Sequence, residues 1–123
     1  MKPLSCFALG LALAVCGCSK EKAAAAVKAV PTFKASCNTP TMGVCTEYTE
    51  EAFVLGEELV KTTCTETKGS YGPAKCPTEK RLGTCVSAGM SRQYYPGGAF
   101  EYSADTASKD CTELVSGQWV ASR

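Results

Sequence analysis

The stretch Cys37-Asn-Thr-Pro-Thr-Met-Gly-Val-Cys45 has a counterpart farther along the chain, Cys76-Pro-Thr-Glu-Lys-Arg-Leu-Gly-Thr-Cys85. Each segment runs from a cysteine through a turn to a glycine, one more residue and a second cysteine. Proline and glycine at such positions favour turns rather than regular structure. The match indicates that this part of the chain contains two related units.

A second pair of segments strengthens this interpretation. Cys64-Thr-Glu is followed by a glycine and Tyr71, and Cys111-Thr-Glu is followed by a glycine and Trp119. Because the matched features come in the same order in both places, we interpret them as an internal repeat. The predicted repeat units are residues 37–75 and 76–123, which together make one cysteine-rich domain, 37–123.

The first unit contains a strand and a helix by pattern. Residues 44–48 alternate in polarity and are rich in β-forming residues, which is typical of a half-buried strand. Thr49 has the residue type of a helix N-cap, and Glu50 and Glu51 then place negative charge in the first turn, where it suits the helix dipole. Four residues fall on one face of that predicted helix: Phe53, Gly56, Val60 and Cys64.

The second unit begins with a predicted hairpin. A strand over about residues 82–87 is turned by Ala88-Gly89 and returns over residues 90–95. Pro96-Gly97-Gly98 then interrupts regular structure.

A second helix is predicted after this loop. Ser103 or Asp105 has the residue type of its N-cap, Gly117 suits its C-terminal end, and residues 118–121 make a last short strand. These elements predict an α+β fold, a small disulfide-rich domain with two helices against a short antiparallel sheet and a pseudo-twofold internal repeat. The alternative is a disulfide-rich all-β domain in which residues 52–55 are a strand.

The N-terminus has the features of an export signal. Met1-Lys2-Pro3 supplies a basic residue, and an apolar run from Leu4 to Val15 follows it. A basic start, a short apolar core and a small residue before the cleavage site are typical of a secretory signal peptide. The run is shorter than the roughly 20 apolar residues that a transmembrane helix needs. We therefore predict that residues 1–17 are a signal peptide.

The end of this run, Leu13-Ala-Val-Cys-Gly-Cys-Ser-Lys20, resembles the lipobox of bacterial lipoproteins. Cys18 follows a small residue, Gly17, and an aliphatic residue, Val15, lies three positions before it. The resemblance implies that Cys18 becomes the first mature residue and carries lipid. Cys16 is the alternative lipidated residue, although it follows the bulky Val15.

Residues 18–36 are predicted to be the lipidated N-terminus and a flexible tether. Residues 19–36 hold four lysines against one glutamate, a charge that complements anionic lipid headgroups. Ser19, rather than aspartate, follows the lipid cysteine, and in the enterobacterial sorting rule this implies the outer membrane. The membrane, reached through the lipid, is therefore a predicted partner. No basic patch in the domain points to nucleic acid.

The predicted domain is stapled by disulfides. Cleavage before Cys18 leaves an even number of cysteines, as a disulfide framework requires: Cys37, Cys45, Cys64, Cys76, Cys85 and Cys111. Six cysteines in so short an exported chain indicate an oxidising compartment. If Val44 and Val86 face the helices, the preferred pairs are Cys45–Cys85, Cys64–Cys76 and Cys37–Cys111. The alternative set is Cys45–Cys64, Cys85–Cys111 and Cys37–Cys76.

The sequence carries no sign of catalysis, a cofactor or a metal. It has no histidine, and the domain has no Cys-x-x-Cys pair, which disfavours the usual hydrolase triads, zinc sites and thiol oxidoreductase motifs. The candidate binding surface consists of four aromatic residues around Pro96-Gly97-Gly98: Tyr94, Tyr95, Phe100 and Tyr102. Aromatic side chains are favoured at binding sites because they bury a large area and tyrosine keeps a polar group.

These features lead us to expect a membrane-anchored envelope lipoprotein without enzymatic activity. Its expected role is structural, or it binds another envelope protein. The alternative is an inhibitor or an adhesin-like module presented at the cell surface, because a small stapled domain suits the display of rigid loops.

Overall fold

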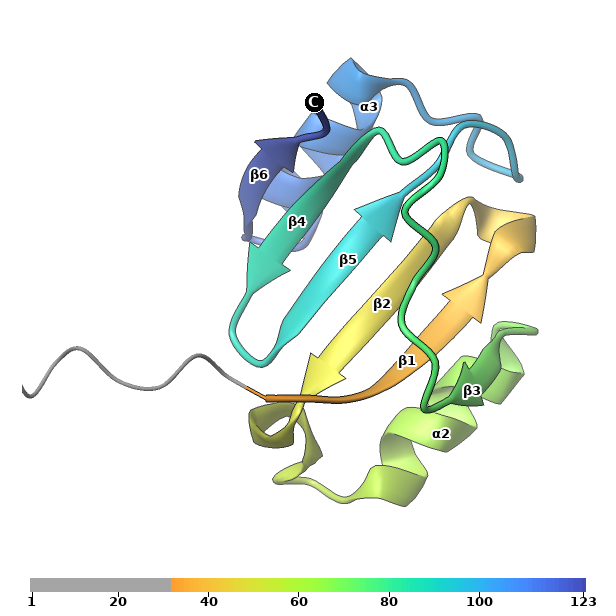
Figure 1. The fold of residues 1–123 in the computed structure, drawn as a ribbon, viewed down its shortest axis with the longest axis vertical. Helices are drawn as coiled ribbons and strands as arrows, with labels where there is room; N and C mark the ends of the chain where they lie inside the picture. Colours follow the sequence, from red (N-terminus) through yellow and green to blue (C-terminus); the bar gives the residue numbers. More distant parts are fainter. Residues whose placement is uncertain (1–31) are drawn as a thin grey trace, which may run out of the picture. The chain divides into compact units, whose positions relative to one another are not determined.

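The computed structural model describes residues 32–123, which form a six-stranded antiparallel sheet and two helices (Figure 1). The strands are β1 (Phe33–Thr39), β2 (Val44–Thr49), β3 (Ser70–Gly72), β4 (Gly83–Ser87), β5 (Met90–Tyr94) and β6 (Gln118–Ala121). The helices are α2 (Glu57–Glu66) and α3 (Ala104–Lys109), and α3 continues as a π-helical turn, Asp110–Leu114. This is the predicted α+β class. The predicted signal peptide and Cys18 lie outside the described residues.

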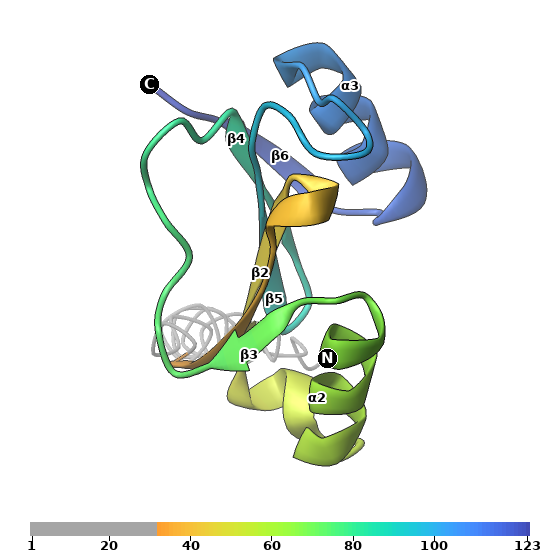
Figure 2. The same ribbon diagram turned by 90° about the vertical axis from the view of Figure 1, so that its right-hand side faces the viewer.

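The strands lie in the order β3-β1-β2-β5-β4-β6. The chain makes strand, strand, helix and strand twice, and this order reads the same when β1, β2 and β3 are exchanged with β4, β5 and β6. Both helices lie on one face of the sheet, which we call the helix face (Figure 2). Residues 73–82, which we call the strap, cross the opposite face, and we call that the strap face.

Three neighbouring strands of the sheet form where the sequence pattern predicts them. The predicted strands within β2, β4 and β5 are confirmed, and Ala88-Gly89 turns β4 into β5. Gly89 has a φ of 72°, a left-handed conformation that glycine adopts at little cost. The pattern does not predict β1 or β3. Because β1 begins at Phe33, residues 33–36 belong to the sheet and not to the tether.

Helix α2 begins later than predicted. The Thr49 hydroxyl donates to the carbonyl of Gly89 at 3.1 Å, so this side chain holds the end of β2 and does not cap a helix. Glu50–Phe53 make only a 3-10 turn. Gly56 then interrupts the helical conformation with a φ of 104°. Glu57 and Glu58 therefore occupy the first turn of α2.

Helix α3 begins as predicted, but its C-terminal end differs from the prediction. Ser103 is its N-cap, and the Ser103 side chain accepts from the backbone N–H of Thr106 while the Thr106 hydroxyl accepts from the backbone N–H of Ser103. This reciprocal capping box satisfies two donors that the first turn would otherwise leave free. The left-handed position after the π-helical turn is taken by Ser116, with a φ of 54°, and not by Gly117 as predicted. Gly117 leads into the predicted last strand, β6.

The apolar core lies on the helix face beneath α3. It consists of Cys85, Tyr94, Ala107 and Cys111, all with 0% exposure. Partly buried apolar side chains surround this cluster: Val44, Leu82, Tyr102, Val115 and Trp119. In α2, by contrast, only Cys64 is buried. The two helices are therefore held to the sheet in different ways.

Candidate functional site

Three disulfides pair all six cysteines of the domain, but both predicted sets of pairs are wrong. The pairs are Cys37–Cys64, Cys45–Cys76 and Cys85–Cys111. Only Cys85–Cys111 belongs to either set, the alternative one.

The error lies in the assumption about which face Val86 occupies. Val86 is 46% exposed, and Cys85 is fully buried in the core beneath α3. Because successive side chains of a strand point to opposite faces, Cys85 lies on the helix face and Val86 on the strap face. Cys45 alternates with Val44, which packs against the core, so Cys45 lies on the strap face and pairs with Cys76 of the strap.

One row of residues across the middle of the sheet explains how the helices are placed. In strand order the row is Tyr71, Cys37, Thr46, Arg92, Cys85 and Trp119. The second and fifth members of the row carry the disulfides to α2 and to the π-helical turn that continues α3. The helices are therefore attached above β1 and β4, which leaves the central strands β2 and β5 to form the floor of a groove between them.

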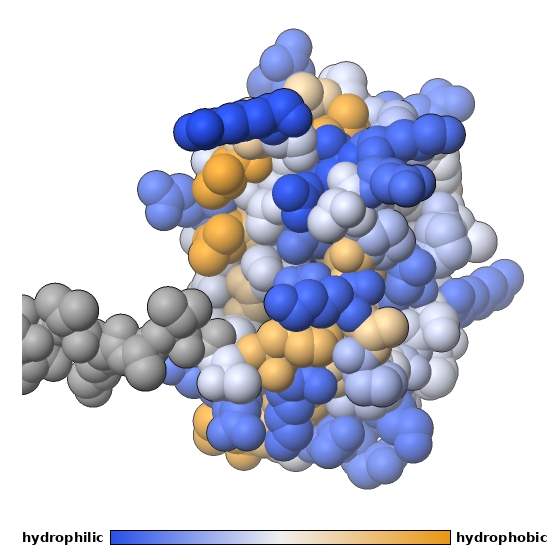
Figure 3. Space-filling model, viewed as in Figure 1, coloured by the Kyte–Doolittle hydropathy of each residue, from blue (hydrophilic) through white to orange (hydrophobic). Residues whose placement is uncertain are grey.

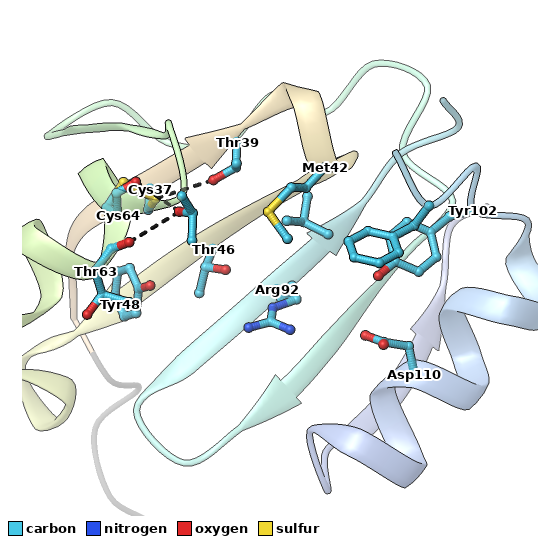
Figure 4. A pocket seen from close by; sticks show the side chains of 13 residues that line it. Cys37, Thr39, Met42, Thr46, Tyr48, Thr63, Cys64, Arg92, Tyr102 and Asp110 are labelled. Carbon is cyan, nitrogen blue, oxygen red and sulfur yellow. Dashed lines mark hydrogen bonds between the residues drawn. A yellow bond between two sulfur atoms is a disulfide. The ribbon is translucent and has the colours of Figure 1, made fainter. Parts of the chain in front are cut away.

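This groove has a volume of about 240 Å³ and is lined from both halves of the chain (Figure 4). Its floor includes Thr46 and Arg92, the two central members of the row. Tyr48 and Thr63 line it on the α2 side, and Tyr102 and Asp110 on the α3 side. Met42 and Phe100 also line it.

Within residues 32–123, Arg92 is the only cation that lines the groove. Its Nε atom is buried and has no hydrogen-bond partner within residues 32–123. No carboxylate oxygen in the same part of the chain lies within 4.0 Å of its guanidinium. Because its charge has no carboxylate partner in this part of the chain, Arg92 is the group in this groove best suited to bind an anion.

Two tyrosines supply further polar groups beside Arg92. Burial raises the pKa of Tyr48 and of Tyr102, and the nearby Arg92 charge partly opposes this rise in both. Both phenols are therefore protonated at neutral pH and able to donate. The Tyr102 hydroxyl makes no hydrogen bond to any other described residue, whereas the hydroxyls of Thr63 and Thr67 donate to backbone carbonyls of α2.

Asp110 supplies a negative charge that balances Arg92, and its carboxylate already accepts a hydrogen bond within the protein. Its Oδ2 accepts a hydrogen bond from the Tyr94 hydroxyl at 2.5 Å. Burial and this hydrogen bond raise the pKa of Tyr94 well above its usual value. The lining thus carries one positive group without an ionic partner among residues 32–123, and one negative group that accepts a hydrogen bond from the core.

The structure separates the four aromatic residues of the predicted binding surface. Tyr94 is fully buried and belongs to the core, so it is not part of an exposed surface. Tyr95 is half-buried, and its hydroxyl donates to the carbonyl of Pro77 in the strap at 2.5 Å. Phe100 and Tyr102 lie beside the groove with ring centroids 5.6 Å apart.

Sequence reasoning missed Arg92, Thr46 and Asp110. A single arginine in a hairpin strand carries no motif. The available signal is the period of β5: Arg92 is two residues from Tyr94, so both side chains share the helix face. An arginine in phase with a core tyrosine marks a charge directed toward the protein interior.

The strap is held to the middle of the strap face by polar contacts. Ser36 donates to the carbonyl of Ala74 at 2.5 Å, and the Glu47 carboxylate accepts from the backbone N–H of Cys76 at 2.9 Å. At the far edge of this face, Val86 and Val120 are 46% and 53% exposed, and Figure 3 shows apolar atoms over β4 and β6. The strap therefore occupies the middle of this face and leaves an apolar edge.

Comparison with known protein families, with curated proteins and with solved structures finds no match. Within residues 32–123, no helix is long and apolar enough to cross a membrane. Over the same part of the chain, no group of three metal-ligating side chains comes together.

Proposed function

We propose that this protein is a lipid-anchored lipoprotein of the outer membrane whose stapled domain binds an envelope partner and catalyses no reaction. The observation that supports this most directly is the use of all six domain cysteines in three disulfides. Disulfides persist in oxidising compartments such as the periplasm and the cell surface. After cleavage before Cys18, that cysteine is the one left over for lipid, because Cys6 and Cys16 are removed with residues 1–17.

The binding role is supported by the groove on the helix face. Its floor carries a cation without an ionic partner among the described residues, and its walls carry aromatic side chains. Residues of both kinds are enriched at binding sites.

We also propose that the domain arose from an internal repeat, with units that differ from those expected from the cysteine spacing. The mirrored strand order supports this, as do disulfides at matching row positions, Cys37–Cys64 and Cys85–Cys111. In this proposal Cys37 corresponds to Cys85, while Cys45 and Cys76 form an additional staple outside the repeat.

A surface-presented inhibitor or adhesin is the second proposal. The loop after β5 favours it, because backbone hydrogen bonds from Tyr95 to Gly43 and from Ala99 to Thr41 hold it against the first half. This fixed loop presents Phe100, which is 56% exposed. Protease treatment of whole cells separates the two proposals: cleavage of the intact protein favours surface display, and protection favours a periplasmic domain.

The anchor is tested by the intact mass of protein extracted from its native membrane, before and after reduction and alkylation. We expect a chain that starts at Cys18, carries lipid and gains six alkyl groups only after reduction. A chain without lipid, or one alkylated before reduction, contradicts the proposal.

A further inference from the structure

We infer that the groove between the two helices binds the carboxylate of a singly charged ligand on Arg92. This inference rests on the proposed binding role and names the chemistry of the bound group. The ligand is either a free small acid or the C-terminal carboxylate of a partner polypeptide, which present the same group to the protein.

The first argument is the state of the Arg92 side chain. It lies on the floor of the groove, at the centre of the sheet, and no carboxylate within residues 32–123 pairs with it. An arginine guanidinium is always charged, and its planar fork of donors matches the two oxygens of a carboxylate. A carboxylate ligand therefore supplies the ionic partner that residues 32–123 do not.

The second argument is the charge of the groove as a whole. Among the described residues, Arg92 and Asp110 are the only charged ones in its lining, and their formal charges cancel. Asp110 cannot turn away without losing its hydrogen bond from Tyr94. A ligand with two negative charges, such as a phosphate monoester, therefore meets repulsion at Asp110, whereas a carboxylate brings the single charge that Arg92 requires.

The third argument is size. The groove measures about 240 Å³, which is below the range of roughly 300–1,000 Å³ for pockets that hold drug-sized ligands. It therefore takes one small acid of amino-acid size or the last residue of a chain. Because α2 and α3 are each fastened by a disulfide, Cys37–Cys64 and Cys85–Cys111, the walls cannot separate widely to admit a larger group.

The fourth argument concerns the body of the ligand. Phe100 and Tyr102 form an aromatic wall on the α3 side, and Tyr48 lies on the opposite side. Aromatic walls favour an apolar or aromatic side chain. The free hydroxyl of Tyr102 then donates to a ligand oxygen that the guanidinium does not reach.

The test is a titration of the full lipidated chain in an uncharged detergent, followed by ¹H–¹⁵N NMR. The probes are N-acetyl-phenylalanine, its neutral C-terminal amide, and N-acetyl-Ala-Ala-Phe with a free C-terminus. We expect both acids to shift the resonances of Thr46, Tyr48 and Arg92, and the amide to leave them in place. Tighter binding of the peptide identifies a chain terminus as the ligand, and equal or tighter binding of the single amino acid identifies a free acid.

Variants assign the effect to the guanidinium. Arg92→Gln should weaken binding of the acids about tenfold or more, because it removes a charge-assisted hydrogen bond. Arg92→Lys keeps the charge but loses the planar fork of guanidinium donors. Its affinity for the acids should therefore lie between that of the unchanged protein and that of Arg92→Gln. Arg123→Gln removes the same charge from an exposed position and should leave binding unchanged. An unchanged spectrum away from the groove shows that each variant is folded.

Three results overturn the inference. They are equal binding of acid and amide, unchanged binding by Arg92→Gln, and no shift in the groove up to about 10 mM probe. None of these concerns the anchor, because lipid on Cys18 is read separately from the intact mass of the same preparation. Conversely, a chain without lipid that still binds the acids through Arg92 rejects the anchor and keeps the site.

Discussion

The two halves of the domain share a framework but are held together differently. In the half made of β1, β2, α2 and β3, the disulfide Cys37–Cys64 fastens the helix to the sheet, and Cys64 is the only buried residue of α2. In the half made of β4, β5, α3 and β6, the disulfide Cys85–Cys111 lies within a core that also contains Ala107 and Tyr94. Small exported domains often use staples where the core is too small. Here α2 buries only the cysteine of its staple, whereas α3 and the turn that continues it combine their staple with apolar packing.

Matching positions show where the packing differs. Tyr48 and Tyr94 each lie two residues after the central member of the row, Thr46 or Arg92. Tyr94 is fully buried, and its ring centroid lies 4.9 Å from that of Tyr102. Tyr48 is only half-buried. Tyr48 instead lines the groove on the α2 side.

The largest expected effect comes from the core tyrosine. Tyr94→Ala should lower the free energy of unfolding by about 3–5 kcal/mol, as for other large buried aromatics. Tyr48→Ala, at the matching position, should cost less than about 2 kcal/mol, because its side chain is half exposed. Urea unfolding followed by circular dichroism gives both values. Equal losses would mean that the halves are packed alike.

The two matching disulfides give the next test. Cys37–Cys64 spans 27 residues and Cys85–Cys111 spans 26, so removing either relaxes the unfolded chain by nearly the same amount. We expect Cys37→Ala/Cys64→Ala and Cys85→Ala/Cys111→Ala each to cost about 2–5 kcal/mol.

The two double variants should nevertheless differ in structure. Loss of Cys37–Cys64 should release α2, because its other side chains are exposed or half-exposed, whereas α3 should stay in place through its core contacts. Hydrogen exchange of the helix amides measures this. Equal protection of α2 and α3 in the two variants would contradict the contrast between the halves.

A smaller effect is expected where β6 pairs with β4. Gly83 lies against the indole of Trp119, and an added Cβ would meet the ring. Gly83→Ala should therefore cost about 1–3 kcal/mol through overpacking. Gly72→Ala on β3 is the matched control, because nothing lies within 4 Å of an added Cβ there. A melting temperature that falls equally for both would show that Trp119 does not pack on Gly83.

The smallest effect concerns Tyr71, which matches Trp119 in the row. Burial, the 3.0 Å hydrogen bond to Glu57 and the charge of that carboxylate raise the pKa of Tyr71 to about 12. Since this pKa exceeds the ordinary value of 10.0, the stability it contributes is complete below pH 10 and is lost between about pH 10 and 12. An NMR titration of the ring should show this pKa, and Glu57→Gln should lower it. An unchanged pKa in that variant would remove Glu57 as a cause.

Local signals in the sequence predict much of the fold. Alternation identifies β2, the Ala88-Gly89 turn identifies the hairpin, and Ser103 marks the start of α3. These signals work because each depends on neighbouring residues alone. Thr49 has equally good cap chemistry, but its hydroxyl bonds to Gly89, a residue that only the folded sheet brings near.

The rest depends on long-range contacts that no local pattern carries. β1 contains residues with weak strand preference, and pairing with β2 and β3 on its two sides makes it a strand. The disulfide pairs depend on the face that each strand presents, and a shift of one residue reverses that face. Arg92 was missed for the same reason: its importance follows from the two helices that frame it.

The pairing of the six cysteines is the most direct test of the two-half framework. Cleavage after Met42 with cyanogen bromide and after lysine and arginine with trypsin puts each cysteine of the domain on a separate peptide. Mass spectrometry of the unreduced digest should then find the linked pairs Cys37–Cys64, Cys85–Cys111 and Cys45–Cys76. A bond between Cys45 and Cys85, or between Cys37 and Cys111, would contradict the matching attachment of the helices and the groove between them.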